Sequence, residues 1–345
     1  MAANLFGLDR EGLVAALSPY GARPFHARQV YRWLYARRAY APAGWTDLPR
    51  SVREAVGQDT QVDPGRIVRR TEAKDGTVKV LVGLADGHAV EAVSMVQRGR
   101  VTFCLSSQVG CALACDFCLT GRMGLTRHLT PGEIAGQVAL LQDDRPLPDP
   151  RFNVVFMGMG EPLHNYDGVL GAFRLLTDRE GFALSKRRVT VSTAGLAPAI
   201  ERLAEEPDRP RLAVSLNATT DALRDRLMPI NKRYPIERLL TACRRFLEAS
   251  GERFTFEYVL LSGVNDGDDD VRRLSALLRR VPAKVNLIPF NPVPGKLPYL
   301  PPSRERVLAI RDRLLAAHLP ASIRWSRGAE ARAACGQLAV LEGEA

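Results

Sequence analysis

Three cysteines within eight residues are the part of this sequence best suited to chemistry. Cys111, Cys115 and Cys118 form a C-x3-C-x2-C set in the segment CALACDFC, and no fourth cysteine follows close behind. A 4Fe-4S cluster normally takes four cysteine ligands, so three would leave one iron open to a substrate or cofactor. The spacing therefore predicts an iron–sulfur site with an open position.

Two other interpretations of these cysteines stay open at this point. A structural zinc site needs four ligands, and the nearest further candidate is His128, ten residues beyond Cys118. Alternatively, the cysteines are unrelated buried thiols. The chain has six cysteines in 345 residues, and three of them fall within eight positions, which makes chance clustering a weak explanation.

Several further segments, in a fixed order, carry a resemblance to a known family. The cysteine spacing is that of the radical S-adenosylmethionine (SAM) superfamily, in which SAM chelates the open iron. The segment VSMVQRGRVTFCLSSQVGCALACDFC, followed by FMGMGEPLHN, LAVSLNATT, IPFNPVPG and AACGQL, is similar to the RlmN/Cfr family of RNA adenosine methyltransferases. The resemblance implies a 4Fe-4S cluster on Cys111, Cys115 and Cys118, and two SAM molecules per turnover.

The same resemblance predicts a set of SAM contacts. The segment GMGEP offers glycines for close backbone approach and Glu161 as an anion for the SAM ammonium group. Small hydroxyl and amide side chains at strand ends suit the ribose and adenine edges of SAM. The residues assigned to SAM by the resemblance are Gly160, Glu161, Ser192, Ser215, Leu216, Asn217 and Asn291.

Two cysteines outside the triplet match the family's thiol chemistry. The ring carbons of adenine are too weakly nucleophilic to attack SAM directly, so the family uses a protein thiol and a radical. Cys335, in AACGQL, matches the methyl-carrying cysteine, from which a 5′-deoxyadenosyl radical would abstract hydrogen. Cys104, in VTFCLSS, matches the thiol that releases the product by forming a disulfide with Cys335. The alternative for Cys104 is a small buried hydrophobe.

Glu91 matches one further position of the family, and the residues before Cys335 depart from its pattern. Glu91, in HAVEAVSM, matches the family's candidate acceptor of the adenine ring proton, and its alternative is a solvated strand residue. Family members usually carry two or three acidic residues just before the methyl-carrying cysteine. Here Glu330 is the only one, and the other positions carry Ala329, Ala331 and Arg332. This departure concerns the local fold or the RNA contacts of the loop.

Strand-like and helix-compatible segments alternate through the middle of the chain, which is typical of α/β proteins with a parallel sheet. The resemblance favours an incomplete (β/α)6 radical SAM barrel, and the alternative is an open doubly wound sheet. In either case the site should lie at the carboxyl ends of the strands. The six expected strands span residues 101–107, 152–158, 188–194, 211–217, 254–260 and 284–290.

The N-terminal part has a different composition. Helix-compatible segments separated by Gly and Pro predict a small helical accessory domain over residues 1–77. One of its helices carries Arg28, Arg32, Arg37 and Arg38, and its alternative is an ordinary solvated helix. The family's corresponding domain contacts RNA. The remaining parts are a β extension over 78–100, the partial barrel over 101–325, and a C-terminal segment over 326–345 that carries Cys335.

Charge and family resemblance together predict the partners. The chain has 48 Lys and Arg against 38 Asp and Glu, for a net charge of +10, which favours polyanions but is weak evidence alone. The resemblance implies methylation of an adenosine in 23S rRNA and of the adenosine next to the anticodon in tRNA. Either ring carbon 2 or carbon 8 is the target in this family, and we favour carbon 2. An external flavodoxin- or ferredoxin-like electron donor is also implied.

The sequence predicts a cytoplasmic monomer with no membrane segment. Charged residues interrupt the N-terminal segment where a secretory signal would be apolar, and no apolar stretch reaches the roughly 20 residues that cross a bilayer. Two functional alternatives remain. One is a different radical SAM enzyme that acts on a protein or small molecule, and the other is a non-catalytic iron–sulfur or zinc protein that binds RNA.

Overall fold

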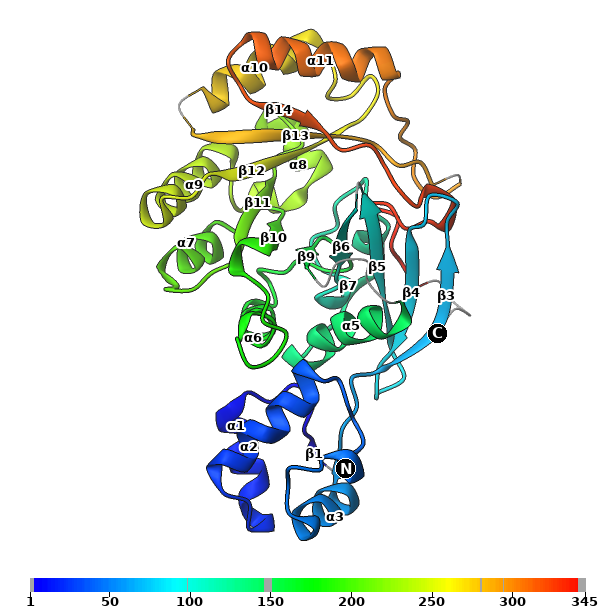
Figure 1. Ribbon diagram of the computed structural model, residues 1–345. Helices are drawn as coiled ribbons and strands as arrows, with labels where there is room; N and C mark the ends of the chain where they lie inside the picture. The colour runs from blue at the N-terminus through cyan, green and yellow to red at the C-terminus, as the bar shows by residue number, and fades with distance from the viewer. Residues whose placement is uncertain (1–2, 98, 146–150, 280, 294, 341–345) are drawn as a thin grey trace.

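A ten-stranded sheet organises the protein (Figure 1). The computed structural model describes residues 3–97, 99–145, 151–279, 281–293 and 295–340. The strand order is β14-β13-β12-β11-β10-β9-β6-β5-β4-β3, and all pairings from β6 to β14 are parallel. These parallel strands are β6 Arg100–Cys104, β9 Phe152–Phe156, β10 Val189–Thr193, β11 Arg211–Ser215, β12 Phe254–Leu260, β13 Ala283–Pro289 and β14 Ala321–Ile323.

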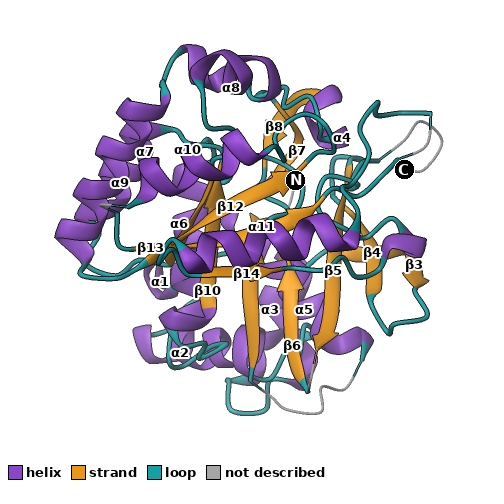
Figure 2. Ribbon diagram, turned by 90° about the horizontal axis from the view of Figure 1, so that it is seen from above, coloured by secondary structure: helices purple, strands orange, loops and turns teal. Residues whose placement is uncertain are grey.

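Helices connect the parallel strands and cover the outside of the sheet (Figure 2). All six predicted strands are present, in the predicted order and as direct neighbours, which confirms the partial (β/α) barrel. The sheet ends at β14 on one side and β3 on the other and does not close. The connecting helices are α5 Pro131–Asp144, α6 Tyr166–Thr177, α7 Ala197–Glu205, α8 Asp221–Leu227, α9 Ile236–Ser250, α10 Asp268–Leu278 and α11 Arg304–Ala316.

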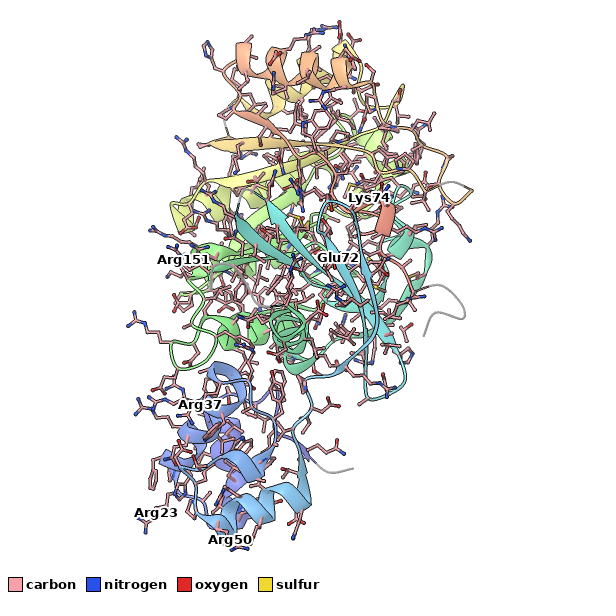
Figure 3. The ribbon with its side chains drawn as sticks, turned by 45° about the vertical axis from the view of Figure 1, so that its right-hand side comes forward. Arg23, Arg37, Arg50, Glu72, Lys74 and Arg151 are labelled. Atoms are coloured by element: carbon pink, nitrogen blue, oxygen red, sulfur yellow. The ribbon has the colours of Figure 1, made fainter. Side chains whose placement is uncertain are left out.

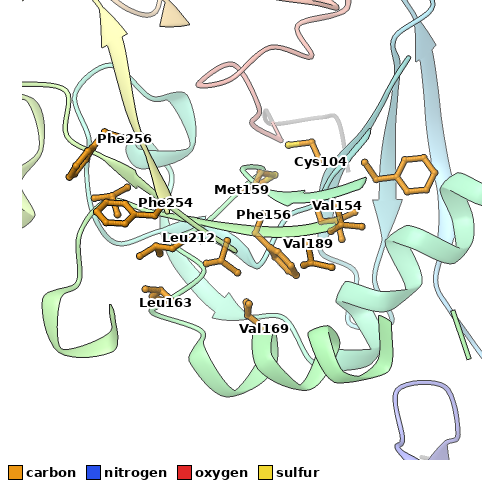
Figure 4. Close-up of a cluster of buried hydrophobic side chains, with 14 of the residues drawn as sticks. Cys104, Val154, Phe156, Met159, Leu163, Val169, Val189, Leu212, Phe254 and Phe256 are labelled. Atoms are coloured by element: carbon orange, nitrogen blue, oxygen red, sulfur yellow. The ribbon is translucent and has the colours of Figure 1, made fainter. Parts of the chain in front are cut away.

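Apolar side chains between the sheet and these helices form the main core. Val154, Val191 and Val214 are fully buried on successive parallel strands, as expected for strands covered on both faces. Figure 4 shows part of this core, with Cys104 beside the cluster that contains Val154 and Phe156. The core therefore reaches the carboxyl end of β6, where Cys104 is the last residue.

Three antiparallel strands extend the sheet beyond β6. They are β3 Arg66–Glu72, β4 Val78–Gly83 and β5 Ala89–Gln97, and β5 joins β6 in antiparallel register with Val93 opposite Cys104. The predicted β extension over 78–100 is thus present. It begins earlier than expected, because β3 lies inside the segment 1–77 that the sequence indicated as helical. The exposed, Arg-rich face of β3 gave no alternating apolar pattern by which to recognise a strand.

The N-terminal unit has a small core of its own that also packs on helix α5. Leu13, Val30 and Trp45 are fully buried in it, and Ala135 and Ala139 of α5 complete it. The three expected helices are present, although the second ends in a π-helical turn. Its elements are β1 Ala3–Asn4, α1 Arg10–Leu17, η1 Ser18–Tyr20, α2 Pro24–Tyr31, η2 Arg32–Ala36, η3 Pro42–Gly44, α3 Arg50–Asp59 and β2 Thr60–Gln61.

The arginines of α2 and the turn after it face carboxylates of the protein. Arg28 and Arg32 both bind Glu180, which follows α6, with Nε–Oε1 and Nη2–Oε1 distances of 2.6 and 2.9 Å. Arg38 pairs with Asp143 of α5 at 2.7 Å. Arg37, labelled in Figure 3, stacks over Trp33 with its guanidinium carbon 3.9 Å from the ring centroid. Ion pairs thus dock this unit onto the barrel.

Candidate active site

The three-cysteine segment lies at the carboxyl end of β6, as the sequence predicted. It follows the hairpin strand β7 Gln108–Cys111, which pairs with β8 Gly124–His128, and it leads into the short helix α4 Leu119–Arg122. Gly110 has a φ of +76°, and a Cβ there would lie 1.8 Å from the carbonyl oxygen of Gly124. Only glycine therefore permits the tight crossing that starts the cysteine segment.

Cys111, Cys115 and Cys118 line one cavity, which encloses about 970 Å³, part of it open to solvent. In the described part of the chain, no group of three or more His, Cys, Asp or Glu side chains is arranged to hold a single metal ion. Each cysteine of a 4Fe-4S cluster binds a different iron, so thiols spread around a cavity suit a cluster rather than one ion.

Burial keeps the free thiols protonated. Burial raises the pKa of Cys111 to about 12 and the pKa of Cys115 well above its usual range. Metal ligation needs thiolates, and bound cations stabilise a thiolate strongly enough to deprotonate it. The residues present therefore fit an iron–sulfur cluster held by Cys111, Cys115 and Cys118.

Gly160 and Glu161 form a second wall of the same cavity. They lie in the loop between β9 and α6, where Gly160 has a φ of +99° and a Cβ would lie 2.6 Å from the Cβ of Gln108. The Glu161 carboxylate accepts hydrogen bonds from the backbone N–H groups of Leu163 and Ala194, at 3.0 and 2.7 Å. Burial raises the pKa of Glu161 to about 7.

The other predicted SAM residues are close to this wall, with one exception. Ser192, Ser215, Asn217 and Asn291 all line the cavity. Asn217 has a φ of +56°, and its side-chain oxygen accepts from the backbone N–H of Val259 at 2.8 Å. Leu216 is fully buried and does not line the cavity; its backbone N–H donates to Glu257 O, and its carbonyl oxygen accepts from Arg224.

Arg224, in α8, connects the strand ends that carry these residues and was not predicted. Its side chain is completely buried. Its guanidinium donates to the carbonyl oxygens of Ala194, Leu216 and Ser215 at 2.7, 3.0 and 3.0 Å, and to Oδ1 of Asn231 at 3.0 Å. One arginine therefore fixes the loops after β10 and β11 relative to each other. In the sequence it resembles any charged residue of an amphipathic helix.

A second cavity adjoins the first, and Cys335 lines both. The second cavity is also lined by Cys104 and by Arg324, which follows β14. Burial raises the pKa of Cys104 to about 12, and the neighbouring Cys335 adds to this effect. The structure thus brings together Cys104 and Cys335, which are 231 positions apart in the sequence.

The segment around Cys335 is held by hydrogen bonds from several directions. Asn291 Nδ2 donates to the Cys335 carbonyl oxygen at 3.0 Å, and the Leu119 N–H donates to Gly336 O at 2.9 Å. Gln337 Nε2 donates to Pro292 O at 2.9 Å. The segment, red in Figure 1, follows β14 and passes beside β4 and β3. These hydrogen bonds thus join the C-terminal segment to the loop after β13 and to the helix that follows the cysteine triplet.

Glu91 lies outside the lining of both cavities. It is buried in β5, where its Oε1 pairs with Lys79 Nζ of β4 at 2.6 Å and its Oε2 accepts from the backbone N–H of Ala339 at 3.0 Å. Lys79 Nζ also donates to Arg332 O at 3.3 Å. The Lys79–Glu91 pair therefore contacts the segment that carries Cys335 on both sides of that residue, at Arg332 and at Ala339. In the loop before Cys335, Arg332 has a φ of +50°. Glu330 of the same loop pairs with Lys74 at 3.6 Å.

The fold and the three-cysteine cavity together define a radical SAM enzyme. Residues 105–274 match the family model of the Radical SAM superfamily, and residues 3–62 match that of the ribosomal RNA large subunit methyltransferase N-terminal domain. A crystal structure of a radical SAM methyltransferase from Sphaerobacter thermophilus superimposes with a TM-score of 0.91. It is 44% identical and covers 97% of this chain and 99% of its own.

Two curated relatives identify the family more narrowly. The dual-specificity RNA methyltransferase RlmN of Anaeromyxobacter dehalogenans is 48% identical over 99% of this chain and 92% of its own length. The probable dual-specificity RNA methyltransferase RlmN of Moorella thermoacetica is 49% identical over 97% of this chain and 96% of its own. The chain belongs to the RlmN family of radical SAM methyltransferases. In the described ranges, no helix is long and apolar enough to cross a membrane.

Proposed function

We propose that this protein methylates carbon 2 of an adenosine in 23S rRNA, and of the adenosine next to the anticodon in tRNA, through methylated Cys335. The observation that carries the proposal is the position of Cys335 on the wall shared by two cavities. One cavity contains the cysteine triplet and the SAM residues, and the other contains Cys104. A carrier thiol between a SAM site and a nucleotide site needs this placement.

The residues of the SAM cavity have distinct tasks in this proposal. Cys111, Cys115 and Cys118 would hold the 4Fe-4S cluster, which supplies an electron for reductive cleavage of SAM. Gly160 lets the loop pass close to Gln108, and Glu161 beside it would offer a carboxylate to the SAM ammonium. The side chains at the strand ends, which are Ser192, Ser215, Asn217 and Asn291 with the backbone of Leu216, would contact the rest of SAM.

The two remaining cysteines move the methyl group. The Cys335 thiolate would attack the methyl carbon of one SAM, so that a bond from the Cys335 sulfur to the methyl forms as S-adenosylhomocysteine leaves. A second SAM is consumed in activating the methyl for attachment to the adenine ring. Cys104 then attacks Cys335, so that a Cys104–Cys335 disulfide forms as the methylated nucleotide departs. An external flavodoxin- or ferredoxin-like donor supplies the electron for the cluster, and thiols reduce the disulfide.

Glu91 has two candidate tasks that experiment can separate. If Glu91 accepts the ring proton, Glu91→Gln should form no product, whereas Lys79→Met should still form it. As a positioning residue for the Cys335 segment, it would make both variants slow methylation alike, because either change breaks the Lys79–Glu91 pair. The contacts to Lys79 and Ala339 support the positioning task.

The substrate assignment rests on the family and on charge. Chemistry on a ring carbon requires an adenosine extruded from its stack, and a net charge of +10 favours polyanions. We expect a monomer that acts in the cytoplasm, where ribosomal and transfer RNA are found.

A single incubation tests the proposal. Reconstituted protein is mixed with protein-free 23S rRNA or tRNA, SAM and a low-potential reductant, and nucleosides are analysed by mass spectrometry. We expect 2-methyladenosine; 8-methyladenosine would assign the protein to the carbon-8 alternative. No methylated nucleoside, with SAM still cleaved, would indicate a different radical SAM enzyme. Zinc without iron in anaerobically purified protein would reject the radical mechanism.

Cysteine variants test the carrier. Cys335→Ala should cleave SAM and leave RNA unmethylated, whereas Cys104→Ala should accumulate a covalent protein–RNA adduct. Cys243→Ala is the matched control, because Cys243 is fully buried in α9 and lines neither cavity. Full methylation by Cys335→Ala would reject the thiol-carrier mechanism.

A further inference from the structure

Four neighbouring strands of the barrel begin at an arginine. Arg100 and Arg211 are the first residues of β6 and β11, while Arg151 and Arg188 immediately precede β9 and β10. The register places Arg100 level with Arg151, since Val101 lies opposite Phe152. Arg188 lies two residues further along the strand direction and Arg211 two further again, since Val189 lies opposite Val154 and Thr190 opposite Arg211. Strands in a sheet are about 4.8 Å apart and rise about 3.3 Å per residue, so the four positions form a diagonal row roughly 20 Å long.

These arginines surround one concave surface at the amino ends of the strands. Its lining consists of Arg100, Arg151, Arg187, Arg188 and Arg211, with Gly99, Asn153 and Ser185. The surface encloses about 940 Å³, part of it open to solvent. Arg151 is labelled on the side of the molecule in Figure 3. We call this surface the arginine row.

Arg151 has an interaction of its own, and the following observations concern the other arginines of the row. None of the residues that line the row, all of them in the described part of the chain, is acidic. Arg188 donates to Oδ1 of Asn153 at 3.4 Å, and the neighbouring Lys186 already pairs with Asp208 at 2.8 Å. Arg100, Arg187 and Arg211 have no carboxylate partner within the described ranges. This differs from the N-terminal unit, where Arg28, Arg32 and Arg38 each bind a carboxylate.

The row lies at the opposite end of the strands from the active site. Cys104 ends β6 and Arg100 begins it. Four residues of extended chain separate their Cα atoms by about 13 Å. The second cavity extends toward Arg100 as far as Gln97 and Thr102, but none of the arginines of the row lines it. An anion bound by these arginines would therefore belong to another part of the substrate or to another molecule.

We propose that the arginine row binds the phosphate backbone of the RNA substrate at a distance from the methylated adenosine. Guanidinium groups bind phosphate oxygens through paired N–H donors. A row of several arginines matches a chain of phosphates, whereas a single small anion would use one or two of them. The inference rests on the proposed RNA methyltransferase function and adds to it a binding surface outside the catalytic cavities.

The test compares two double variants of the holoenzyme with the same change in net charge. Arg100→Gln with Arg211→Gln removes two members of the row. The control, Arg245→Gln with Arg272→Gln, removes two exposed arginines of helices α9 and α10, which pair with Glu201 and Asp269. Two RNAs are compared, a long 23S rRNA fragment and a short anticodon stem-loop. Binding and methylation of each are measured at salt concentrations from about 0.05 to 0.3 M, a range that includes physiological ionic strength.

The expected result follows from counterion release. Each lost phosphate contact lowers the slope of log K against log salt by about 0.7 to 0.9, so the row variant should lose about 1.4 to 1.8 in slope. At 0.1 M salt, one decade below 1 M, this corresponds to roughly 25- to 60-fold weaker binding of the long RNA. The rate at saturating RNA, SAM cleavage and methylation of the short stem-loop should match those of the control.

Four results would overturn the inference. Unchanged long-RNA affinity and salt slope in the row variant would do so directly. If the row variant were less thermally stable but bound RNA normally, the arginines would have a structural role instead. Slower cluster reduction by flavodoxin with unchanged RNA binding would assign the row to an acidic protein. If pyrophosphate bound the wild type but not the row variant, and did not compete with RNA, the row would be assigned to small anions. Absence of methylation by the wild type with both RNAs would instead reject the proposed function.

Discussion

Replacement of Arg224 is the sharpest test of how the SAM cavity is built. The side chain is fully buried, and its guanidinium makes four hydrogen bonds, three of them to carbonyl oxygens of the loops after β10 and β11. Burial lowers the pKa of Arg224 to about 10, which still leaves it charged at neutral pH. Arg224→Met should therefore break the connection between these loops and leave their carbonyl groups without a donor.

The expected loss of stability can be worked from these contacts. Hydrogen bonds to a charged group contribute about 1.5 to 3 kcal/mol each, or roughly 6 to 12 kcal/mol for four. Relief of the cost of burying the guanidinium offsets part of this, and breaking a buried charged contact typically costs about 3 to 5 kcal/mol in total. We expect a loss of about 3 to 5 kcal/mol for Arg224→Met. Arg224→Lys should lose less, because an ammonium keeps the charge but not the planar set of donors.

Urea denaturation and calorimetric titration with SAM provide the measurements. The control is Arg226→Met, which replaces an exposed arginine two residues further along the same helix. SAM binding should weaken in Arg224→Met under conditions where the variant is still folded, because Ser215 and Ala194 lose their common support. If Arg224→Met were as stable as Arg226→Met and bound SAM like the wild type, the role assigned to Arg224 would be wrong.

Three further results are expected. Gly160→Ala should abolish SAM binding, measured by calorimetry, because the added Cβ meets Gln108 and the φ of +99° disfavours alanine; normal binding would contradict this reasoning. Lys79→Met should speed amide hydrogen exchange at residues 333–340, because the Lys79–Glu91 pair supports that segment; unchanged exchange would assign the pair to the β extension alone. Release of the protein–RNA adduct should rise almost tenfold per pH unit from pH 7 to 9, because the thiolate fraction of Cys104 grows with pH below its pKa of about 12; single-turnover release that is independent of pH would show that thiolate formation does not limit it.

Much of the site was predictable because local sequence determines it. The positions of Cys111 and Glu161 follow from strand-ending motifs, since parallel strands place their carboxyl ends together. Residues that support the site without lining it were not predictable. Arg224 is spaced like a surface residue, and the carbonyl groups that it binds come from two separate segments, at Ala194 and at Ser215 and Leu216.

The fold shows the same division. The six barrel strands carry continuous apolar runs and were found in the correct order, whereas β3 has an exposed face with no alternating pattern and was missed. The arginines near Trp33 resembled a free basic surface. Their partners, Glu180 and Asp143, are more than a hundred residues away, so no local pattern could reveal the ion pairs.

The shared wall at Cys335 has a consequence for the order in which reactants bind. A residue reached from both sides can be methylated while the nucleotide side is empty. If Cys335 carries the methyl as proposed, SAM could exchange on its own side while RNA stays bound on the other. The enzyme would then be loaded with its methyl group in advance, and the first turnover on newly added RNA should need one SAM fewer than each later turnover.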